Sequence, residues 1–437
     1  MRCRRLEAAS LGVEGVIRAL ERPPEAVAPE IRQSVEAILR AVKTRGDAAL
    51  LEFTERFDGL KLRAQELAVT AEEFAVAREE VRPEVVRALR FAAQRIEAFH
   101  RQTLPRSWWL EDPNGSLVGQ QVRPLERVGI YVPGGRAAYP STVLMTAIPA
   151  RVAGVPDLAL VSPPGEDKSL NPAVLVAAEL AGVTETYRVG GAQAVAALAY
   201  GTETIRRVDK IVGPGNIYVA LAKAMVFGRV GIDSLAGPSE VVVVADGSAD
   251  PDWVAADLLA QAEHDPMARP ILLTPSVALL DGVGRALERQ LPNLPRQAIA
   301  QAALEQNGAL VLTRDLEEAV AVANGLAPEH LELHVENPFP LVFRVRHAGA
   351  IFLGCYTPEV VGDYVAGPNH VLPTGGSARF ASGLGVEDFV KRSSLIQFSP
   401  EGVQEAWPHL SLLCRVEGLE AHGEAARLRL PEGGSSP

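Results

Sequence analysis

The N-terminal part of the chain has the apolar spacing of amphipathic helices. Apolar residues at i, i+4, i+7, i+8 and i+11 form one stripe along a helix, and here they are Ile31, Val35, Ile38, Leu39 and Val42. Gly46 and Asp47 interrupt this stripe, and a second long helix is predicted from Pro83 towards His100. The chain is therefore expected to be mainly helical up to about residue 120.

From about residue 127 the pattern changes to short apolar runs that are rich in β-branched residues. The runs are RVGIYV, DLALVS, TYRVGG, KIVGPG, EVVVVAD, PILLT, GALVLT and GAIFLG, and helix-like segments separate most of them. Strands that alternate with helices predict parallel sheets covered on both faces. Because such sheets bind ligands at the carboxyl ends of their strands, we expect the loops VPGGR, VGPGN, AGPSE and AGPNHVLPTGG to lie at that edge. Further along, a helical segment is predicted from about Pro400 to Leu430.

The charge and the cysteines narrow the class of protein. The formal net charge of −11 argues against nucleic acid or an anionic membrane as partner, because both bind basic surfaces. The three cysteines, Cys3, Cys355 and Cys414, form no CxxC pair, which favours a reducing compartment and excludes a zinc site built from thiolates. The N-terminus has no apolar core of the secretory type, and no apolar run is long enough to span a bilayer. We therefore expect a soluble cytoplasmic protein.

Oxygen and nitrogen ligands without thiols come together in the segment DWVAADLLAQAEH. Asp250-Pro251 is a typical helix start and Asp265-Pro266 a typical stop. Gln261 and His264 stand three residues apart at the end of this predicted helix, so both side chains can face one point. A polar helix end on the surface is the alternative interpretation of the same residues.

Two further segments carry ligand-type side chains. Asp363 and His370 belong to EVVGDYVAGPNHVLPTGG, in which the glycines and prolines predict a shaped loop rather than a strand, and His422 belongs to VEGLEAHGEA. Taken alone, Asp363 is explained as a turn residue and His422 as a solvated helix residue. Taken together, two imidazoles, a carboxylate and an amide suit zinc or a similar divalent metal. That set is Gln261, His264, Asp363 and His422.

An acid and an imidazole stand side by side at Glu329-His330. A predicted helix over 315–323 is stopped by Gly325 and Pro328, and the pair is followed by LELHV, which alternates like a strand. A histidine near its pKa at neutral pH can take up a proton and return it, and a glutamate can activate water. The pair is therefore a candidate for proton transfer, and a charged loop with a hydrogen-bonded histidine is the alternative.

Two turns between a strand and a helix are candidates for nucleotide binding. The segment DKIVGPGNIYVALAKAMVFGRVGID reads as strand, glycine loop, helix and a second strand-like run. Gly213 and Asp233 have the spacing of about twenty residues found in a dinucleotide fingerprint. Tyr218 stands where the third glycine belongs, so the match is partial. VGGAQAVAAL makes a similar turn, with Gln193 at the start of its helix.

Taken in order, these segments resemble the histidinol dehydrogenases over about residues 30–430. The similar segments are VKTRGDAALLEFTERFDG, RVGIYVPGGRAAYPSTVLMTAIPA, GGAQAVAALAYGT, DKIVGPGNIYVALAK, IDSLAGPSEVVVVAD, LLAQAEHDP, APEHLEL, GDYVAGPNHVLPTGGSARFASGLGVEDFVKR and EGLEAH. Each segment alone is modest evidence for the resemblance, whereas a match of all of them in the same order leaves little room for coincidence.

The resemblance implies roles for particular residues. Glu329 and His330 match the general acid/base residues of the family. The matches to its zinc ligands are Gln261, His264, Asp363 and His422. Positions that bind substrate are matched by Ser239, Gln261, His264, His330, Asp363, Glu417 and His422. The NAD-contacting positions are matched by Tyr131, Gln193 and Asn216. His370 belongs to a family motif, and its role stays open.

The resemblance also implies the chemistry: oxidation of L-histidinol through L-histidinaldehyde to L-histidine, the last step of histidine biosynthesis. The zinc, one per subunit, holds the substrate and has no redox change to offer, so the electrons leave as hydride to NAD. The family counterpart of His330 takes the alcohol proton. The counterpart of Glu329 then activates water, and the hydrated aldehyde gives a second hydride to a second NAD.

The expected fold is α/β, with two incomplete Rossmann-like parallel-sheet domains and small helical N- and C-terminal segments. We expect an N-terminal segment over 1–25, a metal and substrate domain over 26–130 and 240–385, and an NAD-binding domain over 131–239. A small domain over 386–437 is expected to be swapped in a homodimer. Glu417 and His422 are five residues apart, about 140° around a continuous helix, although Gly418 can break it.

Three other functions remain as alternatives. A related zinc and NAD dehydrogenase could act on another small alcohol. A zinc hydrolase could use Glu329 to activate a metal-bound water without NAD. A non-catalytic binding protein would need neither the acid/base pair nor the full ligand set.

Overall fold

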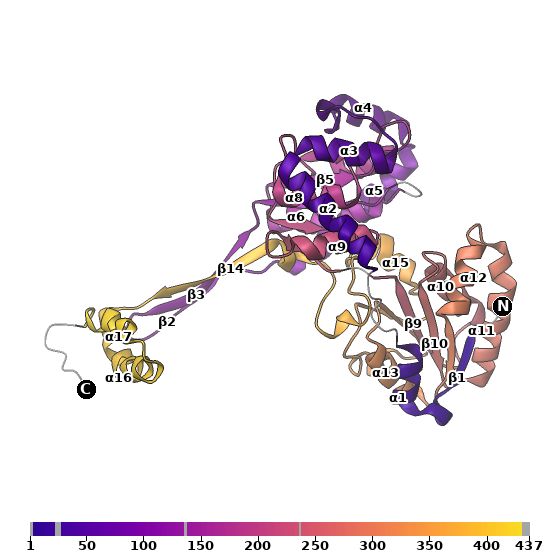
Figure 1. The fold of residues 1–437 in the computed structure, drawn as a ribbon. Coiled ribbons are helices and arrows are strands. Elements are labelled where there is room, and N and C mark those ends of the chain that lie inside the picture. The colour runs from indigo at the N-terminus through magenta and orange to yellow at the C-terminus, as the bar shows by residue number, and fades with distance from the viewer. Residues whose placement is uncertain (1–2, 22–27, 135–137, 236, 431–437) are drawn as a thin grey trace. The chain divides into compact units, whose positions relative to one another are not determined.

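The computed structural model describes residues 3–21, 28–134, 138–235 and 237–430. Its chain divides into two compact units (Figure 1). The first unit comprises Met1–Thr103 and Leu125–Phe389, and the second comprises Leu104–Pro124 and Val390–Pro437. Within the described ranges, no helix is long and apolar enough to cross a membrane.

The first unit contains a five-stranded parallel sheet, in which β4 (Arg127–Tyr131) lies at the centre. The strand order is β6-β5-β4-β7-β8, with β5 (Asp157–Ser162), β6 (Glu185–Arg188), β7 (Lys210–Val212) and β8 (Gly231–Ile232). The connecting helices are α6 (Pro140–Ala153), α7 (Pro172–Ala181), α8 (Gly191–Tyr200) and α9 (Ile217–Val226). The chain runs outward from β4 in one direction and then returns to β7, so the direction of winding switches between these two strands. Nucleotides bind at such a switch in Rossmann-like sheets.

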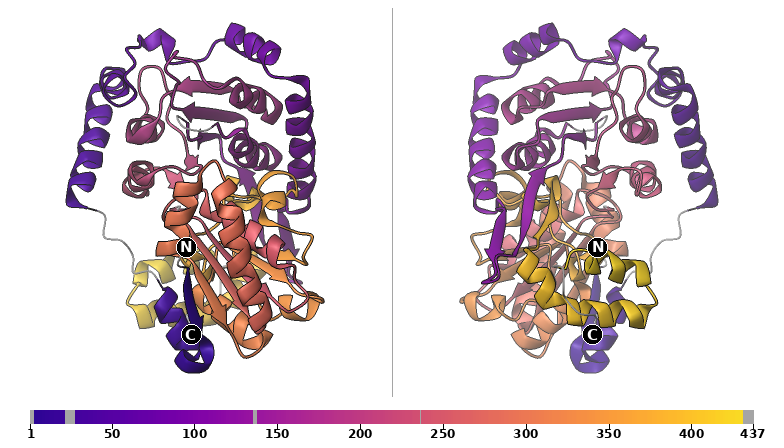
Figure 2. Two further views of the ribbon diagram at one scale, coloured as in Figure 1. Left: turned by 90° about the vertical axis from the view of Figure 1, so that its right-hand side faces the viewer. Right: turned by 90° about the vertical axis from the view of Figure 1, so that its left-hand side faces the viewer.

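The N-terminal helices pack on both faces of this first sheet (Figure 2). These helices are α2 (Pro29–Arg45), α3 (Asp47–Asp58), α4 (Ala71–Glu80) and α5 (Pro83–Gln102). The predicted stripe of α2 shares one hydrophobic core with α8, α9 and Ala159 of β5. Leu89 and Ile96 of α5 share the core of the other face with α6 and Ile130. The packing therefore joins 29–102 to the sheet of 127–232, whereas the expected division grouped 26–130 with 240–385.

The second parallel sheet has six strands in the order β1-β11-β10-β9-β12-β13. They are β1 (Arg4–Glu7), β9 (Glu240–Ala245), β10 (Arg269–Thr274), β11 (Ala309–Leu312), β12 (His330–His334) and β13 (Ala350–Leu353). The helices are α1 (Ala8–Leu20), α10 (Pro251–Ala262), α11 (Val277–Gln290), α12 (Gln297–Gln306), α13 (Leu316–Leu326), α14 (Phe339–Val342) and α15 (Glu359–Tyr364). From β9 to β13 the order repeats that of the first sheet, which confirms the prediction of two Rossmann-like sheets. The N-terminal segment adds β1 to this sheet by parallel pairing with β11.

The second unit is built on a three-stranded antiparallel sheet that the sequence did not predict. Its strands are β2 (Trp108–Glu111), β3 (Leu117–Pro124) and β14 (Val390–Gln397), in the order β14-β3-β2. Two helices follow, α16 (Pro400–Glu417) and α17 (Glu420–Arg427), and they confirm the predicted helical segment. Ser399 caps α16 by accepting a hydrogen bond from the amide of Gly402. Short 3-10 turns elsewhere in the chain are η1 (Ala64–Glu66), η2 (Leu291–Asn293), η3 (Ser377–Arg379) and η4 (Val386–Phe389).

An ion-pair network at the amino end of the first sheet surrounds Glu185. The guanidinium of the buried Arg127 donates to both of its oxygens, at 3.1 and 2.5 Å. The Tyr187 hydroxyl donates at 2.6 Å, and Arg206 donates as well. Burial by itself raises the pKa of Glu185, but the hydrogen bonds from these three partners outweigh it and lower the pKa to about 2.

Replacing Glu185 by glutamine is expected to lower the free energy of unfolding at pH 7 by about 1–3 kcal/mol, because charged hydrogen bonds to buried groups have this range. The carboxylate stabilises the fold above the usual pKa of 4.5, and the contribution disappears as the pH falls towards about 2. Urea unfolding at pH 7, 5 and 3 should therefore show a difference from wild type that shrinks with acidity. Glu179→Gln, at an exposed pair with Arg78, is the control and should change little. A loss that is independent of pH would contradict the prediction.

Candidate active site

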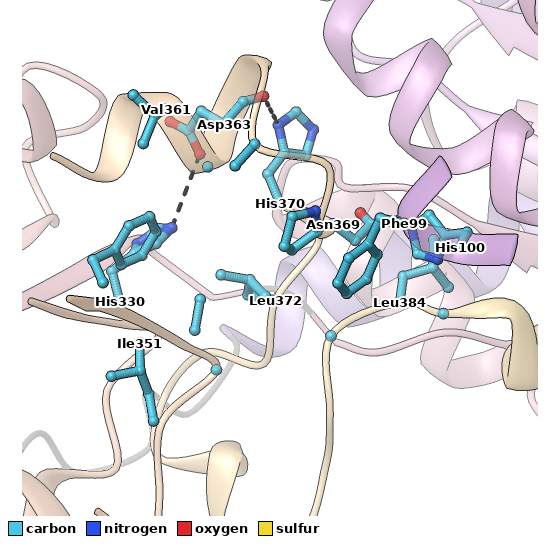
Figure 3. A pocket seen from close by; sticks show the side chains of 18 of the residues that line it. Phe99, His100, His330, Ile351, Val361, Asp363, Asn369, His370, Leu372 and Leu384 are labelled. Atoms are coloured by element: carbon cyan, nitrogen blue, oxygen red, sulfur yellow. Dashed lines mark hydrogen bonds and ion pairs between the residues drawn. The ribbon is translucent and has the colours of Figure 1, made fainter. Parts of the chain in front are cut away.

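The candidate site lies at the amino ends of the strands of the second sheet, not at the carboxyl ends as expected. Glu329 precedes β12, Ser239 precedes β9, and both strands run away from this edge. The loop AGPSE, whose Ala236 lies outside the described residues, therefore belongs to the amino edge. A cavity of about 410 Å³ opens here, lined by residues that include His330, Asp363 and His370 (Figure 3). The strand pattern predicted the sheet correctly, but the site uses the other edge.

The acid/base candidates Glu329 and His330 are both buried. The backbone amide of Glu240 donates to Glu329 Oε2 at 3.0 Å, and the backbone carbonyl of Glu240 lies 3.1 Å from His330 Nδ1. A carbonyl can only accept, so Nδ1 carries the proton and donates. Nε2 of His330 is then the basic nitrogen, and it lies 3.9 Å from Asp363 Oδ1 (Figure 3).

Burial shifts the pKa values of this pair in opposite directions. It raises the pKa of Glu329 well above its usual value of 4.5. It lowers the pKa of His330 to about 4. Both shifts have the same cause, since an apolar surrounding disfavours the charged form of either group. His330 is therefore a neutral imidazole at neutral pH, and Glu329 is a stronger base than an exposed carboxylate.

A group of metal-ligand type stands next to this pair. His264, Glu359 and Asp363 each offer one ligand atom, and these atoms all lie within 4.8 Å of one another. Gln261, at the end of α10, is buried, and its Oε1 has no hydrogen-bond partner within the described part of the chain. The same holds for Oε2 of the buried Glu359. Buried oxygens of this kind are normally satisfied, so the donor set fits a divalent cation bound by imidazole and oxygen ligands.

Glu359 is the site residue that the sequence analysis missed. It begins α15, and Asp363 follows four residues later on the same helix, so both carboxylates project from one face. The segment was predicted as a loop because of its glycines and prolines, whereas the structure forms a short helix that includes Gly362 and ends before the other glycines and the prolines. Spacing of i and i+4 between Glu359 and Asp363 was the available signal. Burial raises the pKa of Glu359 well above 4.5 and that of Asp363 to about 6.

His370, whose role the sequence left open, lies in the wall of the same cavity. Its Nδ1 lies 2.9 Å from the backbone carbonyl of Asp363, to which it donates (Figure 3). Its Nε2 lies 3.4 Å from Thr142 Oγ1. Thr142 is in the first turn of α6, which follows the carboxyl end of β4. His370 therefore connects the ligand-bearing helix α15 with the edge of the first sheet.

Glu417 and His422 belong to the second unit. Gly418 adopts a left-handed φ of 70° and ends α16 directly after Glu417. His422 lies on the next helix, α17, and both side chains are exposed. The helix break anticipated at Gly418 is thus present, and the two residues are not held on one continuous helix.

The three residues expected to contact NAD lie at the carboxyl edge of the first sheet. Tyr131 ends β4, and its hydroxyl accepts a hydrogen bond from the amide of Gly191 at 3.0 Å. Gln193 stands in the first turn of α8, buried, with no partner for Oε1 among the described residues. Asn216 is the exposed N-cap of α9 and accepts from the amides of Tyr218 and Val219. They flank the switch between β4 and β7, although Gly135 and Arg136 of the nearby VPGGR loop lie outside the described residues.

Asp233 does not act as the acidic residue of a dinucleotide fingerprint. Its Oδ2 accepts from the amide of Gly213 at 2.7 Å, and its other oxygen pairs with the buried Lys223. Lys223 Nζ also donates to the carbonyl of Gly213 at 2.9 Å. Both oxygens of the Asp233 carboxylate therefore have partners that hold the VGPGN loop in place. This structural role explains the spacing between Gly213 and Asp233.

Comparisons with known proteins agree over nearly the whole chain. The family model described as histidinol dehydrogenase matches residues 21–430. A histidinol dehydrogenase of Synechococcus sp. is 57% identical over 396 residues, 91% of each chain. One of Geobacillus kaustophilus is 55% identical over 415 residues, 95% of this chain and 97% of that protein. The crystal structure of histidinol dehydrogenase from Elizabethkingia anophelis matches with a TM-score of 0.93 at 38% identity, covering 98% of both chains. The chain belongs to the histidinol dehydrogenase family.

Proposed function

We propose that this protein is an NAD-dependent, zinc-containing histidinol dehydrogenase. It oxidises L-histidinol through L-histidinaldehyde to L-histidine, the last step of histidine biosynthesis. The observation that carries the proposal is the neutral, buried His330, with its basic nitrogen directed at Asp363 beside a group of metal ligands. Membership of the family supplies the substrate.

Zinc would be held by Gln261, His264 and Asp363 of one chain together with His422, and Glu359 lies within reach of the same point. When bound there, zinc supplies a Lewis-acid anchor for the amino and imidazole nitrogens of the substrate and has no redox change of its own. The two oxidations therefore both need NAD as the hydride acceptor. Ser239 and Glu417 are proposed to complete the substrate site.

The first oxidation uses His330 as the base. Because its Nδ1–H is donated to the carbonyl of Glu240, the lone pair of Nε2 can take the proton from the hydroxyl oxygen of the substrate as hydride leaves the carbon that bears this oxygen. The product is the aldehyde. The low pKa of His330 keeps its imidazole neutral before the step, so no proton has to be removed from this residue first.

The second oxidation uses Glu329 to activate water. One oxygen of its carboxyl group accepts from the amide of Glu240, which leaves the other to accept a proton from water that adds to the aldehyde. The raised pKa makes this carboxylate a better base. The hydrated aldehyde then loses a second hydride from its carbon and a proton from one hydroxyl group, which passes to solvent, and so becomes the carboxylic acid.

NAD is proposed to bind at the carboxyl edge of the first sheet, with Tyr131, Gln193 and Asn216 near it. The supporting observation is their place around the switch between β4 and β7, where nucleotides bind in this topology. The unpartnered Gln193 Oε1 is a free acceptor at this edge. We also propose a cytoplasmic location, in keeping with three unpaired cysteines.

The protein is further proposed to be a homodimer in which the second unit completes the neighbouring subunit's site. Apolar side chains of this unit are exposed in the single chain, among them Trp109 at 59%, Leu413 at 63% and Val416 at 84%. Within the described residues, no side chain of this unit joins any of the hydrophobic cores. A unit without a core of its own needs another surface to cover its apolar side chains.

Removing the metal is expected to abolish NADH formation from histidinol, and zinc should restore it, because the substrate loses its anchor. The measurement is NADH absorbance after prolonged incubation with a chelator, dialysis and readdition of zinc or magnesium. Magnesium is the control, since it prefers all-oxygen ligands. Full activity of the metal-free protein would contradict the zinc assignment, and absence of NADH with histidinol in the zinc-loaded protein would overturn the proposed function.

A further inference from the structure

Three buried polar side chains lie directly behind the ligand group of the site. Glu332 and His334 follow His330 on β12 at alternate positions, so all three project from the same face of the strand. His334 Nε2 lies 3.3 Å from Glu332 Oε2 and 3.5 Å from Oδ2 of Asp257, which comes from α10. The exposed fractions are 0% for Glu332, 1% for His334 and 7% for Asp257.

Glu332 is bound to the start of the helix that carries two site carboxylates. Its Oε1 accepts a hydrogen bond from the backbone amide of Glu359 at 2.8 Å. The amides in the first turn of a helix have no acceptor within the helix, and a buried amide without a partner is costly. Glu332 therefore supplies the acceptor that fixes the amino end of α15 against β12.

The same cluster reaches the third element of the site. Asp257 lies one turn before Gln261 on α10, and His334 bridges it to Glu332. The elements that carry His330, Gln261 and the pair Glu359 and Asp363 are thus joined behind the cavity by polar contacts. The His334 imidazole lies between the two carboxylates and is the polar partner that such buried acids need.

We infer that Asp257, Glu332 and His334 form a positioning network that sets the register of α15 against β12 and α10, and thereby the spacing of the proposed zinc ligands. This inference rests on the proposed function, because the groups that it positions are those assigned to the metal. Residues that orient metal ligands without touching the metal typically change its affinity about 10–100-fold when substituted. Substitutions in this network are expected to change zinc affinity by about the same 10–100-fold.

The test compares Glu332→Met with Glu332→Gln by titrating the metal-free protein with zinc against a chromophoric chelator. Methionine has a similar length but no strong acceptor, so zinc affinity should fall about 10–100-fold. The amide oxygen of glutamine can still accept from Glu359, so this variant should stay close to wild type. Glu185→Gln, which weakens the distant first sheet, controls for loss of stability and should not change zinc affinity. Glu332→Ser is measured in parallel in case the methionine variant does not fold. Its zinc affinity is expected to fall by a similar factor.

A double variant separates positioning from a general structural role. In the Asp363→Asn background, whose ligand is already impaired, Glu332→Met should have little further effect on zinc affinity, because its action passes through α15. Fully additive losses would overturn the inference, as would unchanged affinity in folded Glu332→Met. A second zinc per chain that disappears with Glu332→Met would also overturn it, because the cluster would then be a metal site itself. Wild-type protein that binds zinc but forms no NADH would refute the proposed function alone, whereas wild-type protein that binds no zinc would refute both.

Discussion

Glu329→Gln is expected to slow oxidation of histidinaldehyde about 10²–10⁴-fold, the usual contribution of a general base, while slowing oxidation of the alcohol far less. The substitution is close to isosteric, and the amide oxygen can keep the hydrogen bond from the Glu240 amide. What changes is basicity, which burial enhances in the wild type by raising the pKa of Glu329. Only the step that needs activated water should then suffer strongly.

The measurement supplies each substrate separately and records NADH in single turnovers. Histidinol reports the first oxidation, and the aldehyde reports the second. Glu179→Gln, on the exposed surface of α7, is the control for changes in protein quality. If both oxidations slow equally, Glu329 is not the water activator and holds instead some group that both steps need.

Mixing two inactive variants, His330→Ala and His422→Ala, is expected to restore activity to about a quarter of the wild-type level after random subunit exchange in a two-fold symmetric dimer. Half of the dimers are then heterodimers, and each contains one site with both lesions and one site with neither. The prediction follows if His422, on α17 of the second unit, serves the site of the neighbouring chain. The exposed apolar side chains of that unit are the observation behind it.

Exchange must be proven independently, for example by mass spectrometry of differently tagged subunits. His409→Ala, at an exposed position of α16, should be active by itself and controls for damage to the helical pair. If exchange is complete and the mixture stays inactive, each site is built from one chain and the shared-site proposal fails.

Short-range features of this protein could be predicted from the sequence. The stripe from Ile31 to Val42 became α2, and EVVVVA became a strand buried along its whole length. The reason is physical: a helix or strand imposes its own period on neighbouring residues, and that period is visible in the chain. Glu329 and His330 could be found because they are adjacent, and Gln261 and His264 because they stand only three residues apart where α10 ends.

Only the tertiary structure decided which distant segments meet. No spacing along the chain joins Glu359 to His264 or Glu332 to Asp257, because these pairs arise from the packing of α15 and α10 against β12. The helices of 29–102 have apolar faces that could cover either sheet, and the packing placed them on the first. The parallel pairing of β9 with β12 likewise brought Ser239 and Glu329, which directly precede these strands, together at the amino edge of the second sheet. Asp233 fits the spacing of a ribose-binding residue, yet its carboxylate is occupied by Gly213 and Lys223, because a local pattern carries no information about which partner a folded chain will bring to it.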